Sequence, residues 1–209
     1  MRVIITFTFV LALLACGFGR AGEARQGGEP EPPKDASFKL KGLDGKTYES
    51  SEMRGEVLVV SFGATWCVPC TWELVAIEEL KEEYEGKPVR FFWVSIEDKD
   101  RTSDNLLRHY AKERKLSIPV LRDPDAELFS LFSNSSRIPL VVFYDREGRF
   151  VAPAHRGMSQ DITVYKQRVR DRVNALIQQG AGSRVPGAGE GKSFLPAPDT
   201  RHPLPRVRR

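Results

Sequence analysis

Hydrophobic and polar positions divide the chain into a short apolar start, a polar linker, a central region of alternating elements and a polar tail. In the central region, residues 57–62 and 89–96 are apolar runs of the kind found in buried strands. Between them, residues 68–85 place apolar side chains at helical spacing. Because two parallel strands need a crossover connection, usually a helix, this order predicts a β–α–β unit.

Further elements are predicted on both sides of that unit. Asp44-Gly45 is a strong hairpin-turn signal between residues 38–40 and 47–48, which predicts an N-terminal hairpin. The other expected elements are helices over 102–115 and 126–132, a hairpin of 140–144 with 150–152, and a final helix from Asp161 to Gly180. This alternation predicts one α/β domain over residues 37–180, long enough for a single core.

Two cysteines, Cys67 and Cys70, stand where the strand 57–62 leads into the helix 68–85. The two intervening residues allow both sulfurs to come within disulfide distance, which suits dithiol redox chemistry. At the N-terminus of a helix, backbone N–H groups and the positive end of the dipole favour the thiolate of Cys67, which is the nucleophilic form. Pro69 has no N–H to donate and suits the first helical turn.

Two other uses of this cysteine pair are disfavoured. A zinc site needs two more Cys or His ligands at suitable spacing, and the chain offers only Cys16 and three scattered histidines. We therefore expect no metal. A purely structural disulfide across two residues would constrain the unfolded chain little. The sequence thus predicts a redox-active pair.

The stretch Phe62-Gly63-Ala64-Thr65-Trp66-Cys67-Val68-Pro69-Cys70 resembles the active-site segment of the thioredoxin superfamily. It is most similar to the TlpA/ResA-like branch of thiol–disulfide oxidoreductases, with further matches at residues 44–47, 137–139 and 145–148. The resemblance implies a thioredoxin fold: a mixed central sheet flanked by helices, with an N-terminal hairpin and a helical insertion between strands. It implies protein disulfides or dithiols as substrates and no cofactor.

The two cysteines are expected to differ in exposure and in role. Cys67 attacks the substrate disulfide from an exposed position, and Cys70, buried one helical turn further in, resolves the mixed disulfide. Trp66 precedes them directly. It is expected either on an apolar rim around Cys67, as part of the substrate-binding surface, or packed in the core, and both possibilities stay open.

Further site residues are implied by the resemblance. In thioredoxin-like folds a cis proline opposes the dithiol, which implies that role for Pro139. The backbone of the preceding residue, Ile138, would then pair with the substrate chain. Family members also keep an acid at the end of the strand before the insertion, and here either Glu97 or Asp98 fills that position.

The chain departs from thioredoxins at two positions near the dithiol. Ser61 and Gly63 stand where thioredoxins keep a buried Asp and a Trp. Another base is therefore needed to deprotonate the resolving cysteine, and Glu73, three residues after it on the helix, resembles an acid of the ResA-like pattern. The alternative is a glutamate favoured by the helix dipole and otherwise idle.

Residues 1–16 have the pattern of an export signal, with Arg2 followed by a mostly apolar run, 3–15, that is too short to span a bilayer comfortably. The run closes on Leu13-Leu14-Ala15-Cys16, which resembles a bacterial lipoprotein cleavage box and predicts a lipid on Cys16. Ordinary signal cleavage and an uncleaved anchor are the alternatives. With residues 17–36 as a flexible linker, we expect the domain in the bacterial cell envelope, facing the periplasm and tethered to the membrane.

The tail, residues 181–209, is rich in Pro and Gly and holds six basic residues against two acidic ones. The resulting +4 equals the net charge of the whole chain, so the domain is balanced and no nucleic-acid partner is expected. The tail is expected to be a disordered segment that aids solubility, or a segment that binds anionic lipid or envelope polymer electrostatically.

Together these features predict thiol–disulfide exchange on exported proteins. The resemblance to the TlpA/ResA-like branch implies a reductant rather than an oxidant, with a thiol compound or protein as electron donor. One alternative is a non-catalytic envelope binding module whose dithiol is a redox-controlled latch. Another is a thiol peroxidase, but the peroxiredoxin loop would place Pro at position 60 and Thr or Ser at position 64. The chain has Val60 and Ala64 there.

Overall fold

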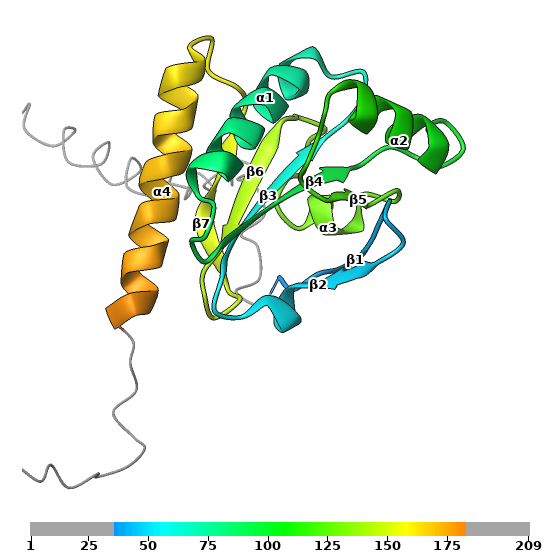
Figure 1. Cartoon of the computed structure of the whole chain (residues 1–209). Coiled ribbons are helices and arrows are strands. Elements are labelled where there is room, and N and C mark those ends of the chain that lie inside the picture. The colour runs from blue at the N-terminus through cyan, green and yellow to red at the C-terminus, as the bar shows by residue number, and fades with distance from the viewer. Residues whose placement is uncertain (1–35, 183–209) are drawn as a thin grey trace, which may run out of the picture.

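The computed structural model describes residues 36–182, which form a mixed seven-stranded sheet with helices on both faces (Figure 1). The strands are β1 (Lys39–Gly42), β2 (Thr47–Glu49), β3 (Val57–Gly63), β4 (Val89–Ser95), β5 (Val120–Arg122), β6 (Leu140–Tyr144) and β7 (Phe150–Arg156). The helices are the short 3-10 helix η1 (Ser50–Met53), α1 (Val68–Glu83), α2 (Asp104–Glu113), α3 (Glu127–Ser130) and α4 (Ile162–Gly182). This architecture is the thioredoxin fold that the sequence predicted.

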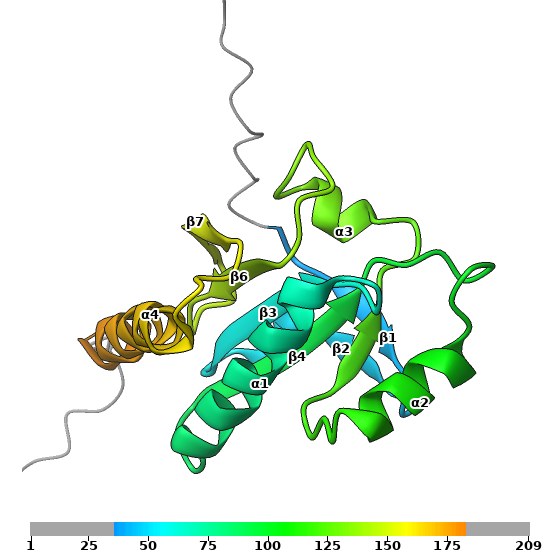
Figure 2. The ribbon, with the colours of Figure 1, turned by 90° about the horizontal axis from the view of Figure 1, so that it is seen from above.

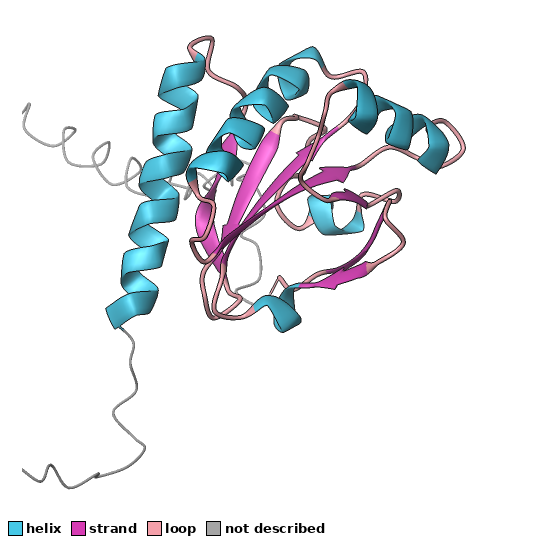
Figure 3. Cartoon of the chain, viewed as in Figure 1, coloured by secondary structure: helices cyan, strands magenta, loops and turns pink. Residues whose placement is uncertain are grey.

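The strand order across the sheet is β2-β1-β5-β4-β3-β6-β7, so β3 lies near the centre (Figure 3). β3 pairs in parallel with β4 along its whole length and antiparallel with β6, and all seven of its residues are buried. α1 connects β3 to β4, which confirms the predicted β–α–β unit. The N-terminal hairpin of β1 and β2 and the second hairpin of β6 and β7 are also present.

Two hydrophobic cores cover the two faces of the sheet. Side chains of α1, α2 and α4 pack on one face, and α3 with the N-terminal segment packs on the other (Figure 2). Successive side chains of β3 alternate between them, with Val59 in the first core and Val60 in the second. Ser61 therefore faces the side of α1 and α4, and this places a polar side chain beneath the start of α1.

The insertion between β4 and β6 differs from the prediction. It contributes a strand, β5, that the sequence analysis missed; three residues are too short a stretch to show a period. β5 pairs in parallel with β4 and antiparallel with β1, so it links the N-terminal hairpin to the sheet. The two helices of the insertion, α2 and α3, are shorter than predicted. α2 begins only at Asp104 because Ser103 is its N-cap residue and accepts the backbone N–H of Leu106.

Two predicted boundaries near the C-terminal end are wrong. β7 continues to Arg156 instead of ending at Ala152, since it is an edge strand and Pro153 needs no ladder partner there. α4 runs past Gly180 to Gly182, because a glycine inside a helix costs only about 1 kcal/mol. The predicted cap is present: the Asp161 carboxylate accepts the backbone N–H of Thr163.

The export signal, the linker and the basic tail were predicted for segments that lie almost entirely outside the described residues. Residues 1–35 and 183–209 are not described, so Cys16 has no structural account. Among residues 36–182, no helix is both long and apolar enough to cross a membrane.

Candidate active site

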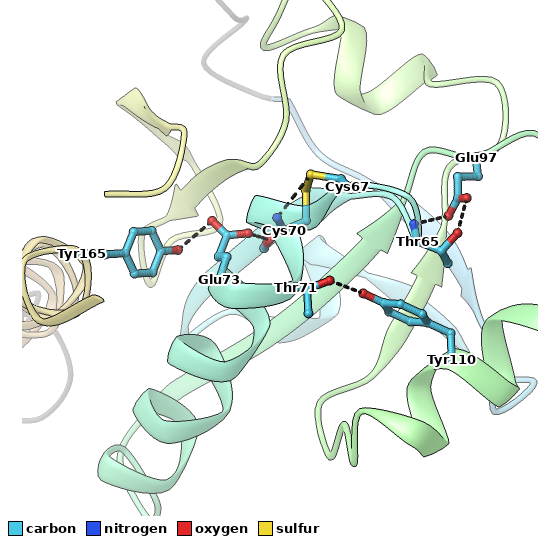
Figure 4. Close-up of a disulfide and its surroundings, with 9 residues drawn as sticks. Thr65, Cys67, Cys70, Thr71, Glu73, Glu97, Tyr110 and Tyr165 are labelled. Atoms are coloured by element: carbon cyan, nitrogen blue, oxygen red, sulfur yellow. Dashed lines mark hydrogen bonds between the residues drawn. A yellow bond between two sulfur atoms is a disulfide. The ribbon is translucent and has the colours of Figure 1, made fainter. Parts of the chain in front are cut away.

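Cys67 and Cys70 form a disulfide at the N-terminus of α1, with Cα atoms 5.2 Å apart (Figure 4). Cys67 is the N-cap residue, and its Sγ accepts the backbone N–H of Cys70 at 3.2 Å. The predicted pairing is thus present, and a helix N–H and the positive dipole end point at the Cys67 sulfur. Residues 36–182 contain no group of three or more His, Cys, Asp or Glu side chains placed to hold a metal.

The expected difference in exposure between the two cysteines is wrong for this disulfide form. Cys67 is only 4% exposed and Cys70 0%, because Ala64 and Ile138 pack against the pair. The two cysteines differ instead in whether a substrate can reach their sulfur atoms. A groove of about 630 Å³ runs past Cys67 and is not lined by Cys70, so only Cys67 can be approached from it.

The groove brings together four residues that the sequence analysis singled out. Trp66 and Cys67 line it from the segment just before α1, and Ile138 and Pro139 line it from the segment just before β6. Trp66 is 68% exposed, so it belongs to the rim and the alternative of core packing is wrong. The Ile138–Pro139 peptide bond is cis, as the resemblance implied.

Glu73 is completely buried beneath the dithiol and is held by two hydroxyl groups. Ser61 Oγ donates to one carboxylate oxygen at 2.5 Å, and Tyr165 Oη donates to the other at 2.8 Å (Figure 4). Burial raises the pKa of Glu73 to about 7, against the opposing effect of the two hydroxyl donors, which favour the charged form. Glu73 is therefore not a solvated helix-start residue.

Cys70 and Glu73 lie against two nearby residues of β3, Gly63 and Ser61. Glu73 contacts Ser61, and a Cβ atom placed on Gly63 would lie 3.3 Å from Cys70 Cβ. Residues 61 and 63 lie on the same face of the strand, because side chains alternate with a period of two. The Glu73 carboxyl group and Cys70 therefore lie over the same face of β3, and Glu73 is hydrogen-bonded to the residue at position 61, where thioredoxins keep a buried Asp.

The acid at the end of β4 is Glu97, and Asp98 is exposed. The buried Glu97 carboxylate accepts the Thr65 backbone N–H at 2.9 Å and the Thr65 hydroxyl at 2.7 Å. It also accepts the Thr102 hydroxyl at 3.0 Å. These bonds fix the loop that presents Trp66 and Cys67, which gives this acid a positioning role in the oxidised structure.

Tyr165, on α4, contacts the site residue Glu73, and the sequence analysis did not single it out. It is fully buried, and burial together with the nearby Glu73 carboxylate raises its pKa well above the ordinary value. Its hydroxyl therefore stays protonated and donates to Glu73. The sequence did hold one signal for this contact: Tyr165 is a tyrosine on the otherwise aliphatic buried face of the last helix. A buried phenol needs a hydrogen-bond partner.

Comparison with known proteins agrees with this geometry. The family described as Redoxin matches residues 28–166. The chain belongs to the Redoxin family. Among similar proteins, ResA of a Bacillus cereus strain, a thiol–disulfide oxidoreductase, is 26% identical over 156 residues, or 70% of this chain and 85% of that protein. ResA of Bacillus subtilis is 24% identical over 180 residues, which cover 84% of this chain and 94% of that one.

Solved structures give the same fold. The exposed lipoprotein thioredoxin Etrx1 of Streptococcus pneumoniae is 26% identical, with a TM-score of 0.53 over 67% of this chain and 99% of that chain. A secreted disulfide oxidoreductase of Mycobacterium tuberculosis, 18% identical, has a TM-score of 0.53 over 66% and 97% of the two chains. With its Cys67–Cys70 pair, this Redoxin-family chain is a thiol–disulfide oxidoreductase of the thioredoxin fold.

Proposed function

We propose that the chain reduces disulfides of exported proteins, with Cys67 as the attacking thiol and Cys70 as the resolving thiol. The observation that carries this assignment is the position of Cys67, which caps α1 and lines the groove. Cys70 is fully buried behind it. A substrate sulfur in the groove can therefore meet only the first cysteine, and the second can act only on the bond that this attack creates.

The exchange balances as two successive displacements. The Cys67 thiolate attacks one substrate sulfur, the substrate S–S bond breaks, and the other substrate sulfur leaves as a thiolate and takes up a proton. Cys70 then loses its proton and attacks the Cys67 sulfur, which releases the second substrate sulfur and forms the Cys67–Cys70 disulfide. Two electrons pass from the chain to the substrate. A thiol electron donor restores the dithiol.

Glu73 is the base that takes the proton of Cys70 in this proposal. A buried thiol ionises reluctantly, because burial disfavours the charged form. The carboxyl group lies beside Cys70, and its pKa of about 7 lets it both accept and return a proton near neutral pH. The Ser61 and Tyr165 hydroxyls hold it in place without competing for the proton.

The groove is the substrate-binding surface in this proposal. Its walls carry the apolar side chains of Trp66, Val68 and Ile138 around Cys67. An apolar groove beside a reactive sulfur suits an extended segment that exposes its cysteines and apolar side chains. The Ile138 backbone would pair with that segment, as the resemblance to thioredoxins implies.

The direction of exchange is tested by the equilibrium reduction potential of the Cys67–Cys70 pair. Potentials in this fold range from about −270 mV for thioredoxin to about −120 mV for strong oxidants. A value near the lower end, measured against a glutathione buffer, supports a reductant. A value near the upper end would make the chain an oxidant and overturn this part of the proposal.

Tyr165→Phe is expected to shift the pH dependence of the release step to higher pH. Removing the hydroxyl removes a donor that favours the charged carboxylate, so the pKa of Glu73 should rise, by roughly one unit. The shift is measured from the rate of mixed-disulfide release across a pH series. Tyr84→Phe is the matched control, since Tyr84 also bonds to α4, through Asn174, but does not touch Glu73. Equal shifts in both variants would contradict this role of Tyr165.

The anchor is proposed from the sequence, because Cys16 lies outside the described residues. Support comes from the Leu13-Leu14-Ala15-Cys16 box and from the similar pneumococcal protein, which is a lipoprotein. Wild type is expected in the membrane fraction, and Cys16→Ser is expected to be released with altered gel mobility. One acyl chain binds membranes only marginally, so the anchor should carry more than one. A variant that stays membrane-bound with unchanged mobility would contradict lipidation.

A further inference from the structure

Trp93 carries a buried hydrogen-bond donor that lacks an acceptor. The side chain is on β4 and is 0% exposed, and its Nε1 has no hydrogen-bond partner among residues 36–182. Buried indole N–H groups usually find a partner, because an unpaired donor away from water costs free energy. Because this unpaired donor lies beside the active site, we expect its acceptor to be a group that is absent in the oxidised form and forms on reduction.

The position of this N–H is fixed by its distances from Gly63. A Cβ atom placed on Gly63 would lie 2.6 Å from Trp93 Nε1 and 3.4 Å from Cys70 Sγ. The two atoms therefore flank one small space and lie at most about 6 Å apart. Residue 63 is a glycine, so its side chain does not fill that space. The indole nitrogen from β4 thus reaches the place that a side chain at position 63 would occupy.

The indole ring is held in this orientation from two helices. It stacks on the Tyr110 ring of α2, with ring centroids 5.5 Å apart and an angle of 26° between the planes. Tyr110 Oη is in turn hydrogen-bonded to Thr71 Oγ1 at 3.1 Å, and Thr71 directly follows Cys70 (Figure 4). A ring fixed by stacking and by this bond keeps its N–H directed at the Gly63 space instead of turning toward another acceptor.

Reduction changes the Cys70 sulfur, which lies across this space from the indole N–H, into a stronger acceptor. In the disulfide this sulfur is a weak acceptor, but as a thiolate it carries a full negative charge and accepts strong hydrogen bonds. We propose that the indole N–H of Trp93 donates to the Cys70 thiolate in the resolving step and stabilises it. The inference rests on the proposed function, because it needs Cys70 to ionise behind the mixed disulfide.

The other groups around Cys70 make a neutral donor useful. Glu73 lies on α1 with it and Cys67 caps that helix, Ser61 comes from β3, and Tyr165 reaches Glu73 from α4. An ionised Glu73 opposes a thiolate beside it by like-charge repulsion. Once Glu73 has taken the proton it is neutral, and the indole N–H then stabilises the thiolate without adding a charge that the disulfide form would have to bury.

The test is a titration of Cys70 alone, in a Cys67→Ala background, followed by ultraviolet thiolate absorbance. Adding Trp93→Phe keeps an aromatic ring against Tyr110 and removes the N–H. At a pH where the thiolate is the minor form, its fraction is expected to fall about tenfold, which corresponds to a pKa of Cys70 raised by about one unit. Trp72→Phe is the matched control, because Trp72 is an exposed tryptophan on α1. Equal Cys70 titrations in the two variants would overturn the proposal.

A second measurement needs no change at Trp93. The indole N–H resonance of Trp93 is followed by NMR through the same titration and is expected to move downfield as Cys70 ionises, whereas that of Trp72 stays in place. A Trp93 resonance that does not follow the Cys70 titration would refute the hydrogen bond. Neither experiment involves substrate or turnover. An unchanged release rate in Glu73→Gln would therefore contradict the role of Glu73 as the base, but it would not contradict the hydrogen bond between Trp93 and the Cys70 thiolate.

Discussion

Cys67→Ala is expected to lower insulin disulfide reduction with dithiothreitol by roughly a thousandfold or more, to the uncatalysed rate. Cys67 is the sulfur that lines the groove, and its Sγ accepts the Cys70 N–H at the start of α1. Cys70 is fully buried, so it cannot replace Cys67 as the attacking group. Turnover is followed by the precipitation of reduced insulin chains.

The control for this variant is its stability. Neither Cys67→Ala nor reduced wild type contains the Cys67–Cys70 disulfide, so the two should unfold at nearly the same temperature. A folded variant without turnover assigns the attack to Cys67. Substantial turnover in the folded variant would show that another group attacks the substrate.

Glu73→Gln is expected to slow the release of the mixed disulfide by about a hundredfold or more, while attack by Cys67 proceeds as in wild type. The amide keeps the shape of the carboxyl group. Its oxygen can still accept one of the two hydroxyls, Ser61 or Tyr165, and its NH2 group can donate to the oxygen of the other, but it cannot take a proton at neutral pH. The dependence of release on a group with a pKa of about 7 should disappear. Stopped-flow kinetics with a peptide disulfide separates attack from release.

The same variant changes the pH dependence of stability in a defined direction. Burial raises the pKa of folded Glu73 from 4.5 to about 7, so between these pH values the folded chain binds more protons than the unfolded chain. The free energy of unfolding of wild type should therefore fall as the pH rises through this window, by roughly 3 kcal/mol. Glu73→Gln should lack this contribution.

Glu79→Gln is the matched control, because Glu79 also lies on α1 but forms an exposed ion pair with Lys166. It should keep wild-type release kinetics and the wild-type fall in stability. If Glu73→Gln also keeps wild-type release kinetics from about pH 5 to about pH 9, Glu73 is not the base.

Local patterns were sufficient to predict the elements that position the dithiol. The apolar run of β3, the helical spacing of α1 and the placement of Cys67 and Cys70 between them all act over a few residues, and the structure has them as expected. The interactions that surround the dithiol act over long sequence distances. Tyr165 meets Glu73 across 92 positions and Thr65 meets Glu97 across 32, and no local pattern encodes such pairs.

Other features depended on packing that a sequence pattern does not reveal. Glu97 and Asp98 are adjacent and chemically alike. Which of the two side chains is buried depends on the direction of the backbone after β4, and a sequence pattern does not give that direction. The low exposure of Cys67 arises because Ile138, far away in the sequence, packs against it. In the sequence, Trp93 is one apolar residue among others in a predicted buried strand. Only the structure shows that its N–H lacks an acceptor and lies next to Gly63.

The central claim is that Cys67 attacks the substrate and Cys70 releases it. The most direct measurement is peptide mapping by mass spectrometry after reduced Cys70→Ser reacts with a peptide disulfide. The account predicts a stable mixed disulfide between the peptide and Cys67, and in wild type only the internal Cys67–Cys70 disulfide. A wild-type adduct as long-lived as that of the variant, or a Cys70→Ser variant with no adduct on Cys67, would contradict it.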